Sequence, residues 1–409
     1  MSDYPKDWEE VELGEYNLIT SSKRVFEKEW ENRGVPFFRT RDIVSFHSKE
    51  EQNDKLFISE ETYRNKVMVS GAPHKGDLLV TGVGSIGIPF LIENDNKIYF
   101  KDGNIIWIKK GDFFHPKYLY YLFLSSKIKN QILNLSGFTT VGTFTIQNAK
   151  KLKIPIPPLE EQKVIADTLM TFDKHIENLE NLIEKKKMIR DGAVEDLMTG
   201  KTRLDGFDDE WEEVGFSDVV IPKARIGWQG LKKEEYLQSG YSYLISGTDF
   251  NNGTISFDGI SFVTKERFDL DVNIQVCSGD VLVTKDGTIG KVAIVPNINK
   301  KATLNSGVFV FKTNKKLKKY FLYWILRSSM FEKFISELSA GSTIKHLYQK
   351  DLKRFSLYIP TGIKEQQAIA DILTSMDDEI QDLEDEKAKI EKIRAGAMDD
   401  LLTGKVRLV

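Results

Sequence analysis

Apolar side chains recur with a helical period in two blocks of the sequence, residues 161–204 and 365–408. Within each block they are spaced alternately three and four positions apart, and the positions between them are mostly polar or charged. A spacing that averages 3.5 residues predicts long helices with a narrow apolar seam that suits one partner helix. The predicted seam residues are Ile165, Leu169, Phe172, Ile176, Leu179, Ile183, Ile369, Leu373, Met376, Ile380 and Leu383.

The two helical blocks are copies of one sequence. Glu161–Leu204 aligns with Glu365–Leu408 at a constant offset of 204, without a gap and with about half of the positions identical. The seam is interrupted at different points in the two copies, which favours pairing of the two helices with each other. Packing of each helix on its own domain stays an alternative. Asp173 and Asp377 are plausible interior N-caps, so each block could be one helix or two.

The segments that precede the two blocks show the short apolar runs typical of strands. β-Branched and aromatic residues are interrupted by Gly, Asn and Asp, and an amphipathic helical stretch lies near the end of each segment. GDLLVTGVGSIG at Gly76–Gly87 returns as GDVLVTKDGTIG at Gly279–Gly290. The sequence therefore predicts an α+β protein with a pseudo-two-fold internal repeat, in which two divergent globular bodies alternate with two similar helices. The expected boundaries are 1–157 and 205–360 for the bodies, and 158–204 and 361–409 for the helical blocks.

Charge is distributed unevenly, although the formal net charge is only −3. Residues 222–358 contain 21 Lys and Arg against 12 Asp and Glu, whereas residues 1–158 are nearly balanced at 22 to 20. A locally basic body suits a polyanionic ligand. The chain has no apolar run of membrane-spanning length, a polar N-terminal stretch unlike a secretory signal, and a single cysteine, Cys277. We therefore expect a reducing, cytoplasmic location.

Two glycine-containing motifs resemble phosphate-binding loops but lack what those loops require. Gly82–Gly87 matches a dinucleotide fingerprint, yet a strand-like run follows where a helix is needed. Thr199–Thr202 lacks the upstream glycine of a P-loop, and a helix C-cap at Gly200, echoed by Gly404, explains it. The five histidines show no metal-ligand spacing, and no nucleophile elbow, methyltransferase tetrapeptide or helicase motif occurs. We expect no catalytic residue, no metal site and no cofactor in this chain.

Basic and hydroxyl side chains in the predicted turns of both bodies offer the chemistry of DNA contacts. Arg and Lys suit phosphates and guanine, and Ser and Thr can bond to the backbone or to bases. Each residue alone is more readily explained as a solvated surface group, so the hypothesis depends on their occurrence at turns in both bodies. The candidate DNA-binding residues are Arg39, Thr40, Arg41, Ser85, Thr139, Thr140, Lys223, Arg225, Lys285, Thr288, Ser342, Thr343 and Lys345.

The layout and the phrases PPLEEQKVIADTL, GDVLVTKDGTIG and LMTGKTRL resemble the DNA-specificity subunits of type I restriction–modification systems. The resemblance covers essentially the whole chain. It implies that each body is a target recognition domain that reads one half of a bipartite, interrupted site in double-stranded DNA. It also implies that the helices form an antiparallel, coiled-coil-like spacer that sets the gap and docks two modification (methyltransferase) subunits. Restriction (translocase and nuclease) subunits would join the complex, and S-adenosylmethionine, ATP and Mg would act in these partners.

Two other functions stay open. A standalone enzyme such as a fused methyltransferase is disfavoured by the missing active-site tetrapeptide. A non-DNA coiled-coil scaffold, whose two bodies bind proteins, is the main alternative. Salt-dependent, sequence-selective DNA binding would separate it from a specificity subunit.

Overall fold

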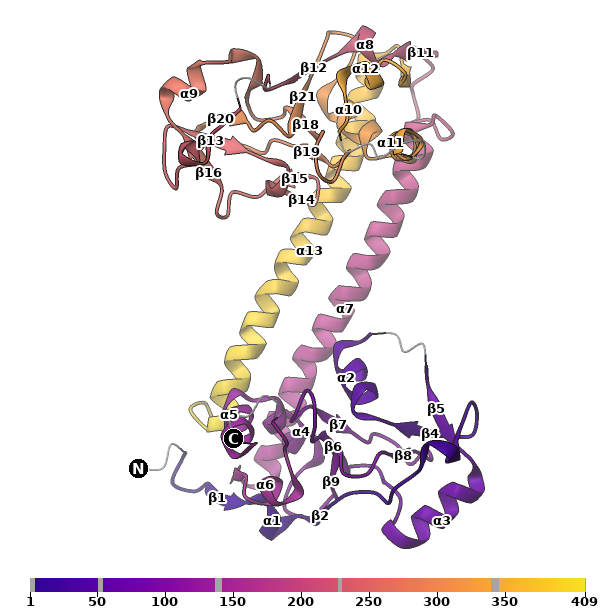
Figure 1. The fold of residues 1–409 in the computed structure, drawn as a ribbon, viewed down its shortest axis with the longest axis vertical. Helices are drawn as coiled ribbons and strands as arrows, with labels where there is room; N and C mark the ends of the chain where they lie inside the picture. Colours follow the sequence, from indigo (N-terminus) through magenta and orange to yellow (C-terminus); the bar gives the residue numbers. More distant parts are fainter. Residues whose placement is uncertain (1–3, 51–53, 137–141, 227–229, 340–345, 409) are drawn as a thin grey trace. The chain divides into compact units, whose positions relative to one another are not determined.

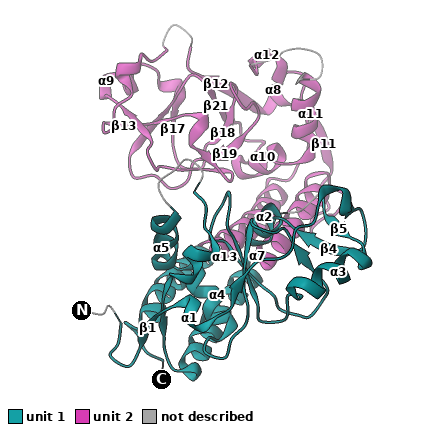
Figure 2. Cartoon of the chain, turned by 60° about the horizontal axis from the view of Figure 1, so that its bottom comes forward, with its two compact units in different colours: residues 1–180, 386–409 teal, residues 181–385 magenta. Residues whose placement is uncertain are grey.

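The computed structural model describes all residues except 1–3, 51–53, 137–141, 227–229, 340–345 and 409. It divides into two compact units, residues 1–180 with 386–409 (unit 1) and residues 181–385 (unit 2), as Figure 2 shows. Each unit therefore contains one body and a part of each long helix. The division falls inside the helices and not at their ends, where the sequence pattern puts the domain boundaries.

The first body folds as two four-stranded sheets with helices packed around them (Figure 1). Its strands are β1 (Glu9–Glu12), β2 (Ile19–Thr20), β3 (Trp30–Glu31), β4 (Val35–Phe38), β5 (Leu56–Ile58), β6 (Leu78–Thr81), β7 (Pro89–Leu91), β8 (Tyr99–Phe100), β9 (Ile105–Ile108) and β10 (Lys153–Ile156). Its helices are α1 (Leu13–Tyr16), η1 (Glu27–Glu29), α2 (Thr40–Ser48), α3 (Glu60–Ser70), α4 (Pro116–Leu124), α5 (Ser126–Ser136) and α6 (Ile146–Lys150). The sheets have the orders β2-β9-β6-β7 and β3-β5-β4-β8, and β1 pairs with β10 apart from both. Every residue of the two central strands β6 and β9 is buried, because side chains and helices cover both of their faces.

The second body repeats this plan. Its strands are β11 (Trp211–Gly215), β12 (Val220–Ala224), β13 (Ser242–Ile245), β14 (Phe250–Asn251), β15 (Thr254–Ile255), β16 (Ser261–Val263), β17 (Gln275–Val276), β18 (Val281–Thr284), β19 (Val292–Ile294), β20 (Lys301–Leu304), β21 (Val308–Thr313) and β22 (Ser356–Pro360). Its helices are α8 (Phe216–Val219), η3 (Lys233–Glu235), η4 (Gly247–Asp249), α9 (Lys265–Asp269), η5 (Val272–Ile274), α10 (Lys319–Leu326), α11 (Ser329–Ser339) and α12 (Gln349–Leu352). The sheets have the orders β12-β21-β18-β19 and β16-β13-β20-β17. In both bodies one parallel pair, β4 with β8 and β13 with β20, lies in the second sheet. The first sheet and three strands of the second sheet thus confirm the predicted internal repeat, while the fourth strand differs, since β3 pairs with β5 and β17 pairs with β20.

The repeated blocks form two long helices, α7 (Leu159–Met198) and α13 (Ile363–Thr403). Both run without a break through Asp173 and Asp377, which lie in the middle of a helix and are not caps. Gly200 and Gly404 follow the helix ends with φ of +67° and +71°, and this left-handed conformation confirms the predicted C-caps.

Both helices contribute to the core of each body. In unit 1 one buried cluster joins Ile165 and Leu169 of α7 to Leu402 of α13 and to the first body. In unit 2 the corresponding cluster joins Ile369 and Leu373 of α13 to the last turns of α7 and to the second body. The start of each helix therefore lies beside the end of the other, which makes the pair antiparallel. Packing on the bodies and packing between helices, the two alternatives drawn from the sequence, occur together.

Candidate nucleic-acid interface

Two of the predicted turns in the first body meet at one backbone carbonyl. Thr40, the first residue of α2, donates from its hydroxyl to the carbonyl oxygen of Asn104 at 3.4 Å. The same oxygen accepts the N–H of Gly82 at 2.8 Å, where the turn after β6 begins. Ser85 is exposed in that turn. We call residues 39–42, 82–87 and 101–104 the first-body junction; it brings together sequence-predicted residues from both sheets.

The turn after β6 is held by a hydrogen-bond pattern that the second body repeats. The Thr81 hydroxyl donates to the carbonyl of Ser85 and accepts the N–H of Ile88. In the second body the Thr284 hydroxyl makes the same two bonds, to the carbonyl of Thr288 and from the N–H of Lys291. The strands β6 and β7 on either side of the first turn pair antiparallel. A strand thus follows the glycine-rich motif, which confirms the interpretation of Gly82–Gly87 as a turn and not a dinucleotide site.

The two arginines of the first-body junction have different settings. The guanidinium of Arg39 donates from Nε and Nη2 to the two carboxylate oxygens of Asp42, both at 3.0 Å, and its side chain is only 13% exposed. Arg41 is 56% exposed and pairs with Asp54, which also accepts from Arg39. Desolvation alone would raise the pKa of Asp54, but the hydrogen bonds from the two arginines outweigh it and hold that pKa below its usual value. Arg39 thus serves the local fold, and Arg41 faces solvent.

The second body builds an equivalent junction, in part from residues that sequence reasoning missed. Asp249 accepts the N–H of Ser246 at 2.7 Å, as Asp42 accepts that of Arg39 at 2.6 Å. The N–H of Asn305 donates to the end of β13 at 2.8 Å, in the way that the N–H of residue 101 donates to the end of β4. We call residues 246–249, 285–290 and 305–307 the second-body junction.

Ser246 and Thr248 were absent from the predicted contacts because the repeat changes its offset here. Arg39 and Ser246 are 207 positions apart, whereas the neighbouring motifs are 203 or 204 apart. The available signal was an aspartate four residues after the end of a strand, which is a helix-capping pattern in both bodies.

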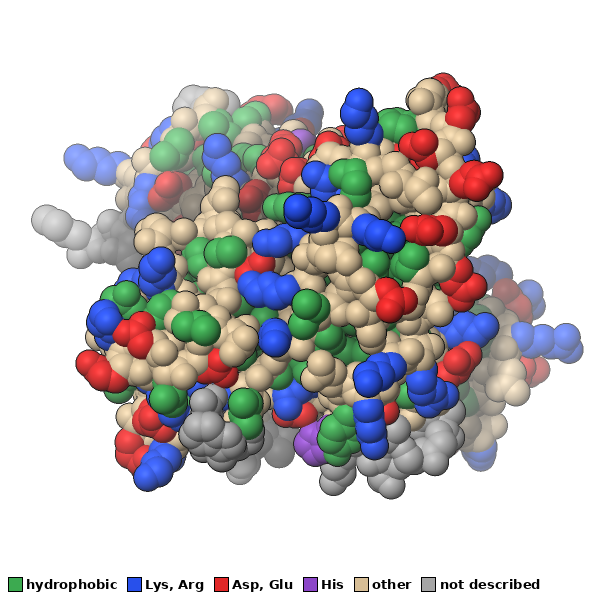
Figure 3. All heavy atoms as spheres, turned by 90° about the horizontal axis from the view of Figure 1, so that it is seen from above, with side chains coloured by type: hydrophobic (Ala, Val, Ile, Leu, Met, Phe, Trp, Pro, Cys, Tyr) green, Lys and Arg blue, Asp and Glu red, His purple; other side chains and the backbone are tan. Residues whose placement is uncertain are grey.

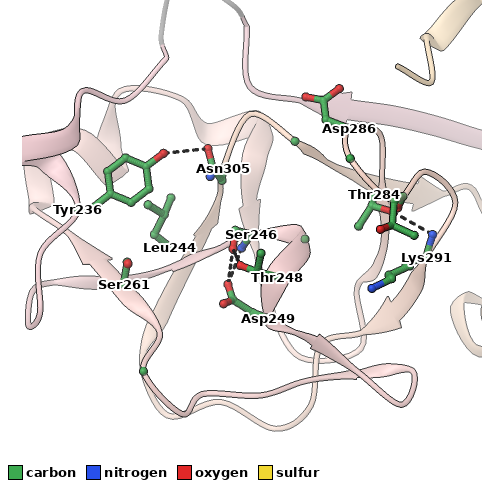
Figure 4. A pocket seen from close by; sticks show the side chains of 15 residues that line it. Tyr236, Leu244, Ser246, Thr248, Asp249, Ser261, Thr284, Asp286, Lys291 and Asn305 are labelled. Carbon is green, nitrogen blue, oxygen red and sulfur yellow. Dashed lines mark hydrogen bonds between the residues drawn. The ribbon is translucent and has the colours of Figure 1, made fainter. Parts of the chain in front are cut away.

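A hollow of about 670 Å³ opens at the second-body junction (Figure 4). Its polar lining includes Ser246, Thr248 and Asp249 on one side and Thr284 with Lys291 on another. The hydroxyls of Ser246 and Thr248 lie 2.7 Å apart. Tyr236 donates to the side-chain oxygen of Asn305 at 3.4 Å at a further edge. Hydroxyl, carboxylate, amide and ammonium groups thus converge on one concave surface, and such groups can bond to base edges.

The other predicted contacts divide between described and undescribed residues. Lys285 and Thr288 both lie in the turn of the second-body junction. The Lys285 side chain is 23% exposed and its ammonium is 5.8 Å from the centroid of the Phe309 ring, while Thr288 is exposed. Five predicted contacts lie outside the described residues, namely Thr139, Thr140, Ser342, Thr343 and Lys345.

The placement of Lys223 and Arg225 in an exposed turn was wrong. Lys223 is half-buried in β12, where it pairs in register with Val310 of β21. Arg225 is only 3% exposed and donates from Nε to the carbonyl of Leu304 at 3.0 Å. Its Nη1 and Nη2 atoms have no hydrogen-bond partner within the part of the chain that the structure describes. Burial, helped by the nearby charge of Arg267, lowers the pKa of Arg225. A guanidinium in this position does not face a ligand on the surface.

Surface charge does not by itself locate a ligand face. On the face shown in Figure 3, Lys and Arg side chains are interspersed with Asp and Glu and do not gather into a single patch. The junctions are therefore identified by their geometry and side-chain chemistry. In the described ranges no cluster of His, Cys, Asp and Glu could hold a metal ion, and no helix is both long and apolar enough to cross a membrane.

The predicted seam residues of the helices fall into three settings. Ile165, Leu169, Ile369 and Leu373 lie in the cores of the bodies. Buried positions farther along the helices are Leu179, Ile183 and Ile380, and half-buried ones are Phe172, Ile176, Met376 and Leu383. Which of these side chains touch across the helix pair stays a prediction.

Charged pairs that sequence reasoning missed join the helices in a symmetric way. In unit 1 Asp173 of α7 pairs with Arg394 of α13, and in unit 2 Asp377 of α13 pairs with Arg190 of α7. Each residue is 204 positions from its equivalent, so the two pairs are one contact made twice.

A second symmetric contact ties the end of each helix to the start of the other. Glu161 is fully buried near the start of α7, where it accepts from Trp8 at 3.2 Å and from Arg407 at 2.7 Å. In unit 2 the fully buried Glu365 accepts from Arg203 at 2.7 Å and from the equivalent tryptophan at 3.4 Å. Residues close to the C-terminus therefore lie against the N-terminal segment of unit 1.

The class of this protein is defined by two similar globular bodies that are joined by two similar, antiparallel helices. Comparison with known sequences finds a family with such a duplication. Residues 5–186 and 208–392 match the family profile described as the type I restriction modification DNA specificity domain. These segments make up most of the chain, which therefore belongs to this family.

Known proteins with the same layout extend the comparison. The MjaVIII specificity subunit of a type I restriction enzyme from Methanocaldococcus jannaschii is 28% identical over 430 residues, which cover 99% of this chain and 94% of that protein. The EcoBI specificity subunit from Escherichia coli is 22% identical over 385 residues, with coverages of 88% and 77%. The crystal structure of a type I restriction–modification S subunit from M. genitalium aligns over 98% of this chain and 99% of that one, with a TM-score of 0.62 and 17% identity. At that identity the likeness shows the fold alone.

Proposed function

We propose that this chain gives a type I restriction–modification complex its DNA sequence specificity, with each body reading one half of a bipartite, interrupted site. The observation that carries the proposal is the pair of junctions. Both bodies build the same backbone arrangement but present different side chains on it, with arginines at residues 39 and 41 and hydroxyls at 246 and 248. One scaffold with two sets of side chains suits two different DNA sequences. The pseudo-two-fold relation puts the half-sites on opposite strands.

The helices α7 and α13 would set the gap between the half-sites and dock two modification subunits, one on each symmetric half of the pair. The contacts between Asp173 and Arg394 and between Asp377 and Arg190, one in each unit, support pairing of α7 with α13. Restriction subunits would join the same complex. We infer that this chain performs no chemistry and works in the cytoplasm, and that S-adenosylmethionine, ATP and Mg act in the partner subunits.

Sequencing that detects N6-methyladenine in host DNA, with and without this gene, tests the proposal. We expect methylation of one interrupted two-part motif to disappear on deletion and to return when the gene is restored. If a purified complex that contains this chain binds no DNA sequence selectively, the scaffold function replaces ours.

Exchange of one body separates the roles of the two. Replacing residues 1–157 with the first body of another family member should change one half-site and leave the other half-site and the gap unchanged. A change in both half-sites, or in neither, would show that the bodies do not read DNA independently.

A further inference from the structure

One carboxylate beside the first-body junction, that of Asp54, holds two arginines. Arg39 donates from Nη2 to the backbone carbonyl of Asp54 at 2.7 Å and to its side chain at 3.3 Å. Arg41 donates from Nη2 to the other carboxylate oxygen of Asp54. The side chain of Asp54 is itself 67% exposed. Asp54 thus links a nearly buried arginine to an exposed one.

The position of Arg41 is electrostatically unfavourable for the helix that contains it. Arg41 is the second residue of α2, and the N-terminus of a helix carries a partial positive charge that disfavours cations. For Arg39, the bonds to both carboxylate oxygens of Asp42 compensate for this unfavourable interaction. For Arg41, the side-chain partner within the described ranges is Asp54. An exposed cation in this position is explained better by a ligand than by the stability of α2.

We propose that Arg41 reads a guanine in the first half-site and that Asp54 is its positioning residue. This inference rests on the proposed function. Arginine can donate two parallel hydrogen bonds to O6 and N7 of guanine, and this pairing needs the planar guanidinium held in one orientation. Asp54 engages one end of the guanidinium, which limits its rotamers before DNA arrives.

The carboxylate also argues for a base contact over a phosphate contact. Asp54 carries negative charge beside Arg41, so it offsets the attraction of the guanidinium for a phosphate. The acceptor edge of guanine is neutral and depends on hydrogen-bond geometry, which the ion pair improves.

The second body has no such arginine at the equivalent position. Thr248 stands where the first body has Arg41, and its hydroxyl lies 2.7 Å from that of Ser246. Asn305 stands where the first body has Lys101. The second half-site is therefore not read by a cation at this position. The two bodies thus have different side chains at positions where their backbones correspond.

The test uses the full chain in a complex with its methyltransferase subunits. The probes are duplexes that carry the methylated motif, with the bases of both half-sites varied one at a time. For Arg41→Gln we expect preference for guanine at one position of the first half-site to fall between about 5-fold and 150-fold, with other positions unchanged. Arg41→Lys should weaken the same preference, because lysine keeps the charge but lacks the planar pair of parallel donors. Asp54→Asn should weaken the same preference by a smaller factor.

Arg64→Gln is the matched control, since Arg64 is exposed in α3 of the same body and lies outside the junction; its motif should stay unchanged. The inference is overturned if Arg41→Gln leaves the motif intact. It is also overturned if affinity falls equally for all sequences while Arg41→Lys retains affinity, which is the signature of a phosphate contact. Absence of any bipartite motif for the unmodified complex would instead refute the proposed function.

Discussion

Asp377 is the residue of α13 on which two arginines of unit 2 converge. Arg190 and Arg327 each donate to a different carboxylate oxygen, and their side chains are 12% and 21% exposed, against 23% for Asp377. Asp377→Asn keeps the side-chain volume but removes the counter-charge that Arg190 and Arg327 share, which leaves Arg190 with only the exposed Asp191 at 2.8 Å. Loss of one partner of a fully buried ion pair destabilises a protein by about 3–5 kcal/mol. Because these groups retain some solvent, we expect about 2–3 kcal/mol for unit 2.

The symmetric residue Asp173 provides the matched control. It is 38% exposed and has one arginine partner, Arg394, together with a hydrogen bond of 2.6 Å from Tyr121. We expect Asp173→Asn to destabilise unit 1 by about 1 kcal/mol, because only one, better solvated cation loses its partner.

Amide hydrogen exchange of the two halves of α13 measures these effects separately. In Asp377→Asn, residues 363–385 should exchange about 30-fold to 150-fold faster, while residues 386–403 change little. In Asp173→Asn the faster exchange should be confined to residues 386–403 and be smaller. Equal effects of the two substitutions, or less than threefold in both, would refute the idea that the converging charges hold the helix pair.

Three further results are expected. Hydrogen bonds from Lys312 and Lys319 outweigh the desolvation of Asp280 and lower the pKa of this carboxyl. The contribution of the carboxylate to stability is therefore present above about pH 4 and is lost as the pH falls through the lowered pKa. Asp280→Asn should lower the unfolding midpoint at pH 7 and make that midpoint depend less on pH in the acid range, whereas an unchanged pH profile would contradict this. Arg225→Met should leave the free energy of unfolding unchanged or raise it by up to about 2 kcal/mol, since the substitution removes buried donors that have no partner among the described residues. The methylated motif should not change. A relaxed motif would mean that Arg225 contacts DNA after all. One added heptad in each helix, after Glu180 and after Asp385, adds about 10 Å to the helix pair. The gap should widen by about three base pairs while both half-sites stay unchanged. A constant gap would show that the helices are not the spacer.

The kinds of side chain in the candidate site were predictable from the sequence, but only some of its residues were. Arg41, Ser85 and Thr288 lie in exposed turns or first helical turns, where the local pattern puts them. Arg225 was misplaced, because a charged residue after a short strand gives no local sign of which side the sheet covers. In the structure this side chain is buried. Ser246 was missed because the offset of the repeat shifts between Arg39 and Ser246. The two positions are recognised as equivalent only by the hydrogen bonds that their backbone N–H groups make.

The sequence by itself determined the duplication, the two long helices, their glycine caps and the family. These features depend on periodicity and local backbone preference, which a chain expresses over tens of residues. Only the tertiary structure decided which loops meet. The bond from Thr40 to Asn104 spans 64 positions, and the contact between Arg394 and Asp173 spans 221. Such contacts depend on how strands and helices pack, so burial, charge pairing and the junctions follow from the fold and not from local pattern.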